Sequence, residues 1–102
     1  MNESTVTITV ADGVMHVAGE IDMYSATCLD SALADVGCPQ LVDMSAVSFM
    51  DCAGLNALTR HHRRRVEQGE ALRVVAMSRA VERVLEVSGL LPMLAAESAT
   101  AA

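Results

Sequence analysis

Alternating polar and apolar residues open the chain and predict a β-hairpin. Over residues 5–10, threonine alternates with valine and isoleucine, the period of two expected of a strand with one buried face. The sequence Ala-Asp-Gly at 11–13 is a turn signal, and the strand pattern resumes over residues 14–18. The second strand is therefore expected to end within Gly19–Asp22.

A helical period replaces this alternation in the next segment. Apolar residues at 29, 32, 33 and 36 recur every three or four positions, so they share one face of a helix. Ser25 is suited to cap this helix at its start, and Gly37 is suited to stop it after about Val36.

The second half of the chain repeats the strand–helix pattern twice. An apolar strand is expected over residues 41–44, followed by a helix that begins near residue 52 or 53 and ends before Gly69. Another strand is expected over residues 72–77, and Ser78 is suited to cap a third helix.

Finer expectations concern the second helix and the end of the chain. Spacing places Leu55, Leu58, His62 and Val66 on the inner stripe of the second helix. Residues 90–94 form a last apolar segment, which is either a short strand or a helical turn, and residues 97–102 predict a frayed tail.

The order of these elements, β-β-α-β-α-β-α, predicts an α/β fold with a mixed sheet. Strands joined through helices pair in parallel, whereas the opening hairpin is antiparallel. A chain of 102 residues forms one domain, and a domain of this size buries roughly two-thirds of its unfolded surface. We expect a single domain over residues 1–102, with a core at about 5–94 and a flexible tail at 95–102.

Composition narrows the classes of partner. Hydrophobic residues make up 52% of the chain, which argues against disorder, and aromatic residues only 2%, which disfavours stacking on nucleic-acid bases. The formal net charge of −6 repels DNA and anionic membranes at long range. We therefore expect a basic protein partner and no direct binding of nucleic acid.

Cysteine usage and hydropathy indicate a cytoplasmic protein. The three cysteines, Cys28, Cys38 and Cys52, are odd in number and lack metal-ligand spacing. No signal peptide is evident, and no apolar run approaches the ~20 residues of a membrane span. No cofactor, metal site or catalytic constellation is expected.

The turn Asp51–Gly54 is the most informative site candidate. Asp51 is suited to cap the second helix, whose N-terminus offers unpaired backbone N–H groups and a partial positive charge. Such an entrance can hold an anion or contact a partner protein. A hydroxyl at position 52 could accept a phosphoryl group, but the residue there is Cys52.

A run of basic residues, RHHRRR at 60–65, follows later in the same helix. One interpretation is an exposed C-terminal half of the helix, where cations suit the helix dipole; the other is a basic patch for a partner or a nucleotide. His61 and His62 are not expected to bind a metal together, because adjacent residues point about 100° apart on a helix.

Three segments resemble the STAS family (sulfate transporter and anti-sigma factor antagonist domain). Gly19–Asp22 (GEID) is similar to the family's G-E-[LI]-D, and Val42–Leu55 (VDMSAVSFMDCAGL) to its D-[LM]-S-x-V-x-F-[MI]-D-S-[ST]-G-[LI]. Ser78–Leu90 (SRAVERVLEVSGL) resembles the late S-x-x-V-x-R-x-L-x-x-[ST]-G-L segment. The resemblance spans about residues 5–94 and implies a small mixed sheet with helices packed mainly on one side.

The resemblance also implies a non-enzymatic protein switch. In the anti-sigma factor antagonists of this family, the unmodified protein binds an anti-sigma factor, often a serine kinase, and releases a sigma factor. Phosphorylation of the serine in the central motif breaks that complex. The acid of the first motif, here Asp22, would support phosphorylation or partner contact.

The chain departs from the family at the phospho-acceptor position. Cys52 stands there and Ala53 replaces the next hydroxyl residue, so phosphorylation control is expected to be absent. Three interpretations stay open: a near-isosteric change in a domain that only binds, a permanently active antagonist, or a redox switch with Cys28 or Cys38 as a resolving thiol.

We expect an anti-sigma factor antagonist that binds a serine-kinase-type anti-sigma factor and regulates transcription in bacterial stress. The alternatives are a STAS regulatory subunit of a transporter and a thiol-based redox sensor, and the oligomeric state stays open between a monomer and a weak dimer. Gly54 would keep the backbone close to the partner, and Met50 would offer an adaptable apolar contact. The expected partner-binding residues are Asp22, Ser48, Met50, Asp51, Cys52, Ala53, Gly54 and Asn56.

Overall fold

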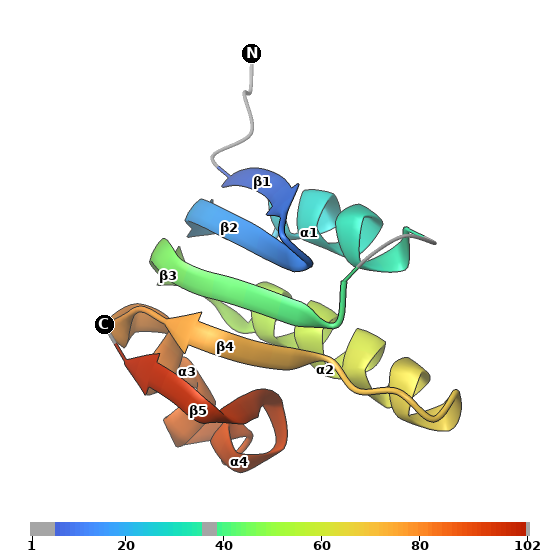
Figure 1. Ribbon diagram of the computed structural model, residues 1–102. Helices are drawn as coiled ribbons and strands as arrows, with labels where there is room; N and C mark the ends of the chain where they lie inside the picture. Colours follow the sequence, from blue (N-terminus) through green and yellow to red (C-terminus); the bar gives the residue numbers. More distant parts are fainter. Residues whose placement is uncertain (1–5, 36–38, 102) are drawn as a thin grey trace.

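The computed structural model describes residues 6–35 and 39–101, so the predictions for Gly37 and Cys38 lie outside the described residues. From the second strand onward, successive strands are joined through helices, as the sequence predicts (Figure 1). The elements are β1 (Val6–Ala11), β2 (Val14–Ile21), α1 (Ala26–Ala34), β3 (Leu41–Met50), α2 (Cys52–Glu67), β4 (Arg73–Met77), α3 (Arg79–Ser88), α4 (Leu91–Leu94) and β5 (Ala95–Ala101).

The five strands form one mixed sheet in sequence order, β1-β2-β3-β4-β5. β1 pairs with β2 antiparallel, and every later pair is parallel. Helices α1, α2 and α3 lie behind the sheet in Figure 1, so they cover one face. The predicted α/β class, the mixed sheet and the one-sided helices are confirmed.

A tight turn of two residues closes the opening hairpin. Asp12 and Gly13 both have positive φ values, 55° and 77°, and Ala11 pairs directly with Val14. Positive φ at both central positions defines the turn whose twist matches that of the flanking strands, and Asp-Gly is a favoured sequence for it. The turn predicted from the sequence is confirmed.

The core lies between the sheet and the helices and contains no aromatic side chain among the described residues. From the sheet, Met15 and Met44 are 1% and 0% exposed; from α1 and α2, Leu29 and Leu58 are both 0% exposed. The aliphatic core predicted by the composition is confirmed.

The third strand is longer than the expected 41–44, because it extends to Met50. Its buried residues are Val42, Met44, Val47 and Met50, so the spacing changes from two to three after Met44. Register shifts against β2 account for this change, since a bulge adds a residue and re-aims the side chains that follow. A strict period of two therefore detects only the first part of the strand.

The end of the chain also differs from the expectation. The sequence predicts a flexible tail over residues 95–102, which is wrong, because β5 occupies Ala95–Ala101 and pairs with β4. The pairing partner lies some 20 residues earlier, so local composition does not reveal it. Residues 90–94 are mostly helical, as α4, which agrees with the helical alternative.

Helix α2 buries a different stripe from the one that the spacing predicts. Leu58 and His62 face inward as expected, but Val66 is 53% exposed. His61 and Arg65 are buried in its place, at 4% and 8% exposure. Long polar side chains can bury their apolar parts while their polar ends form hydrogen bonds. A prediction from the spacing of apolar residues alone therefore misses them.

Candidate functional site

The candidate site lies where the second and third strands end. Ile21 and Met50 are register partners in the parallel pair β2–β3, so both strands end at the same edge of the sheet. The backbone N–H of Asp51 donates to the carbonyl oxygen of Ile21 at 3.1 Å. The turn before α1 and the turn before α2 are thereby joined into one surface, at the carboxyl ends of parallel strands where α/β proteins place binding sites.

Asp51 caps α2 as the sequence predicts, and it leaves the residue after it exposed. Its backbone is extended, and its Oδ1 accepts a hydrogen bond from the N–H of Ala53 at 2.9 Å. Cys52 is the first residue of the helix and is exposed. The thiol therefore sits at a helix entrance where the N-terminal backbone amides carry a partial positive charge.

Gly54 is required by packing, which corrects the role expected for it. A Cβ atom at this position would lie 2.7 Å from Cγ of Met50 and 2.8 Å from Cγ2 of Ile21. Gly54 therefore faces the sheet and lets α2 approach the ends of β2 and β3. Met50 is 3% exposed, so its expected contact with a partner is corrected as well: it packs beneath the site.

Asp22 organises the neighbouring turn through a reciprocal cap. Its Oδ1 accepts from the N–H groups of Tyr24 and Ser25, at 3.0 and 2.9 Å, while the Ser25 hydroxyl accepts from the Asp22 N–H at 2.9 Å. This arrangement is a capping box, in which each residue satisfies the other's unpaired group. The expected cap at Ser25 is corrected, because Asp22 caps α1 and Ser25 reciprocates.

The same hydrogen bonds lower the pKa of Asp22. The N–H of Ser25 makes the largest contribution, and the Ser25 hydroxyl and the N–H of Tyr24 lower the pKa further. Partial desolvation opposes them. Asp22 is therefore held in its ionised form as part of the turn.

Exposed apolar side chains flank these turns, and the sequence pattern does not predict them. Met23 and Tyr24 are 65% and 78% exposed in the turn after β2, and Phe49 is 49% exposed near the end of β3. Tyr24 and Phe49 are the chain's two aromatic residues, yet neither is in the core. Two aromatic residues that both lie beside a motif could have signalled an interaction surface, because aromatic residues are enriched at such surfaces.

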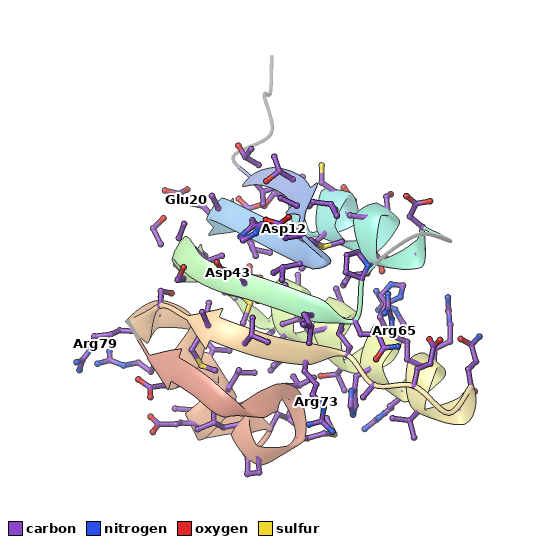
Figure 2. All side chains as sticks on the ribbon, viewed as in Figure 1. Asp12, Glu20, Asp43, Arg65, Arg73 and Arg79 are labelled. Carbon is purple, nitrogen blue, oxygen red and sulfur yellow. The ribbon has the colours of Figure 1, made fainter. Side chains whose placement is uncertain are left out.

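The predicted site residues divide by exposure. Ser48, Cys52 and Asn56 are exposed, and Asp22, Asp51 and Ala53 are half-buried. We call these six residues, with Met23, Tyr24 and Phe49, the edge surface. In Figure 2, the labelled residues Glu20 and Arg79 lie at this same edge of the sheet.

Polar side chains hold α2 in place behind the edge surface. Arg65 donates to the carbonyl oxygens of Leu33 at 3.2 Å and Pro39 at 3.1 Å, so it ties α2 to the end of α1 (Figure 2). His61 Nε2 and the Arg60 guanidinium both contact Oδ1 of Asp30 on α1. Arg60 first, and then His61, lowers the pKa of Asp30.

His62 joins α2 to the residue just before β4, because the N–H of Leu72 donates a hydrogen bond to Nδ1 of His62 at 3.3 Å. The two histidines thus have separate structural roles. Among the described residues, no group of three or more His, Cys, Asp and Glu side chains could hold a metal ion. Nor does any helix in that part of the chain have the length and hydropathy to cross a membrane.

Comparison with known proteins gives a consistent result. The family model described as "Mlab, STAS domain" matches residues 4–95. The anti-sigma-F factor antagonist RsfB of Mycobacterium tuberculosis is 31% identical over 94 residues, covering 84% of this chain and 76% of that protein. The anti-sigma-B factor antagonist of Bacillus subtilis is 32% identical over 79 residues, covering 74% and 72% respectively.

Solved structures agree with this fold. The crystal structure of an anti-sigma factor antagonist from Mycobacterium paratuberculosis is 29% identical, with a TM-score of 0.65 over 88% of this chain and 81% of that one. The unphosphorylated form of the anti-sigma factor antagonist SpoIIAA has a TM-score of 0.67 over 95% and 87%. At 18% identity, the second structure supports the fold alone.

Proposed function

The chain belongs to the STAS domain family, and from this we propose that it is an anti-sigma factor antagonist. It binds an anti-sigma factor, and this binding frees a sigma factor to direct transcription. The observation that carries the proposal is the match to two anti-sigma factor antagonists over about three-quarters or more of the chain. Because sigma factors act on RNA polymerase, we place the protein in the cytoplasm.

Recognition takes place at the edge surface. Its exposed apolar side chains, Met23, Tyr24 and Phe49, supply area that a partner can bury, and burial of such side chains supplies most of the binding energy of an interface. The polar residues around them, including Ser48 and Asn56, form the rim. The protein acts through binding and carries out no chemical step itself.

Control differs from that of a serine-containing antagonist. The partner is an anti-sigma factor of the serine-kinase type, but Cys52 offers a thiol instead of a hydroxyl at the exposed helix entrance. The chain therefore stays in its binding-competent form when the kinase and ATP are present. Binding is constant unless the thiol itself is modified.

A reconstitution experiment tests the proposal. The tagged chain is used to capture partners from its native cell, and the captured anti-sigma factor is then purified in complex with its sigma factor. Addition of the chain is expected to displace the sigma factor in a gel-filtration assay. Capture of a transporter ATPase subunit instead, or no displacement at saturating chain, would contradict the proposal.

The same assay tests the loss of phosphorylation control. After incubation with the captured anti-sigma factor and ATP, the mass of the chain is expected to be unchanged, whereas Cys52→Ser restores the acceptor hydroxyl and is expected to gain one phosphate. A stoichiometric phosphate on the unaltered chain would contradict the argument from Cys52.

A further inference from the structure

A row of arginines on α2 exceeds what the fold and the edge surface require. α2 carries four of the chain's seven Lys and Arg residues, although the whole chain has a net charge of −6. Cations near a helix C-terminus are ordinarily explained by the helix dipole. That explanation covers the last turn of α2, which contains Arg64 and Arg65. It covers neither Arg63, the residue just before that turn, nor Arg60, one turn before Arg64.

The four arginines have different surroundings. Arg65 is buried and serves the contact with α1, and Arg60 pairs with Asp30 at 2.8 Å while its side chain stays 51% exposed. Arg63 and Arg64 are exposed, and no carboxylate among the described residues forms a salt bridge with either. Two guanidinium groups, and part of a third, are thus available to a partner.

These guanidinium groups lie along one open, shallow groove whose lining residues all belong to α2. The spacing of three or four positions places its lining residues on one exposed face of α2. That face continues to the edge surface, because Asn56 lies one turn from Cys52. With a rise of about 1.5 Å per residue, this face of α2 extends roughly 18 Å along the helix axis from Cys52 to Arg64. The groove is lined by Asn56, Thr59, Arg60, Arg63, Arg64 and Glu67.

We propose that this groove binds an acidic polypeptide segment of the anti-sigma partner; the inference rests on the proposed function and extends its docking surface. A guanidinium group presents a planar fork of donors that matches a carboxylate, and successive turns of α2 repeat this match along the groove. An acidic segment would lie along α2 while the partner's main contact occupies the edge surface. Charge complementarity of this kind accelerates association more than it strengthens the final complex.

Charge and composition favour a polypeptide over other anions. A nucleic acid is disfavoured because, among the described residues, no aromatic side chain lines the groove for base stacking. Glu67 stands in the groove and disfavours a compact, doubly charged phosphate. An extended row of single carboxylates can instead align with the arginines and avoid that glutamate.

A titration with a synthetic decapeptide of glutamate tests the groove directly. In NMR spectra of the folded chain, the peptide is expected to shift the backbone amide resonances of the groove residues. The Arg63→Glu variant is expected to lose these shifts, whereas the Arg73→Glu variant is expected to retain them. Arg73→Glu is a matched control because it makes the same change in charge on a different element: Arg73 is exposed on β4, between the buried Leu72 and Val74 (Figure 2). Absent or scattered shifts, equal loss in both variants, or the same shifts with inorganic phosphate would overturn the proposal.

Association kinetics with the captured anti-sigma factor then separate this inference from the proposed function. At low salt, Arg63→Glu is expected to slow association about tenfold and to weaken its salt dependence, with little change for Arg73→Glu. If the unaltered chain binds no anti-sigma factor, the proposed function fails. If it binds and Arg63→Glu associates at the same rate, only the groove proposal fails.

Discussion

Two helices begin at the same edge of the sheet, each with an aspartate, yet their entrances differ in how completely they are closed. At α1, Asp22 and Ser25 cap each other, and the Ser25 hydroxyl also donates to the carbonyl oxygen of Glu20 at 2.8 Å. At α2, the Asp51 side chain accepts one hydrogen bond from a backbone N–H, and the next residue, Cys52, has an exposed thiol. The closed entrance satisfies its own backbone groups within the fold, whereas the open entrance leaves a thiol exposed, and this is where we propose that the partner docks.

The largest effect is expected from a charge at the open entrance. Cys52→Asp is expected to weaken binding of the anti-sigma factor about 100-fold, because a carboxylate would be desolvated at the interface. Folding should be retained, since an acid in the first helical turn is favoured by the dipole. Cys28→Asp is the control, because Cys28 is exposed on α1. If calorimetry shows that Cys52→Asp binds the anti-sigma factor with unchanged affinity, the edge surface is excluded as the binding site.

The next effect concerns stability beneath the open entrance. Gly54→Ala places a methyl group against Met50 and Ile21 and is expected to lower the free energy of unfolding by about 1–3 kcal/mol. Asn56→Ala, on the exposed face of the same helix, is expected to stay within about 0.5 kcal/mol. Urea denaturation measures both variants. Equal stability of Gly54→Ala and the unaltered chain would show that α2 can move away from the sheet.

Removing the two caps compares the entrances directly. Asp51→Ala is expected to cost about 1 kcal/mol, the usual value for a single helix cap. Asp22→Ala should lower the urea midpoint further, because two backbone N–H donors, those of Tyr24 and Ser25, lose their acceptor. A smaller loss for Asp22→Ala than for Asp51→Ala would reverse the distinction between a closed and an open entrance.

The smallest effect is a dependence on acidity. Hydrogen bonding lowers the pKa of Asp22 in the folded chain, so its contribution to stability is present above the unfolded value of about 3.9 and is lost as the pH falls through the lower folded value. Asp22→Asn is expected to flatten, but not remove, the decline of the urea midpoint below about pH 4. Asp30 and Asp43, whose pKa values are also lowered, maintain the rest of the decline. An identical decline in Asp22→Asn would contradict the role of the capping box.

The sequence predicts those features of the fold that depend on local pattern. Asp-Gly in a hairpin turn and an aspartate before α2 each act within a few residues, so they are visible without a structure. Pairing partners far along the chain are not visible in this way. The bulged half of β3 and the whole of β5 depend on neighbouring strands, so the period of two does not detect them.

The candidate site shows the same limit at the level of single side chains. The motif correctly predicts the cap at Asp51 and the exposure of Cys52. The sequence alone does not reveal that Met50 and Gly54 face inward. Direction within a bulged strand follows from its register, which is a tertiary property. For the same reason, the exposure of Phe49 could not be derived from its place in an apolar strand.

The tight contact at Gly54 has a consequence for how the domain can vary. Position 54 tolerates almost no side chain, whereas position 52, two residues earlier on the same helix, faces solvent and is free of that restriction. Substitution can therefore exchange a hydroxyl for a thiol at the entrance without a new hydrophobic core. The same freedom makes Cys52 a natural attachment point for a fluorescent reporter of docking, once the exposed Cys28 and the remaining Cys38 have been replaced by serine.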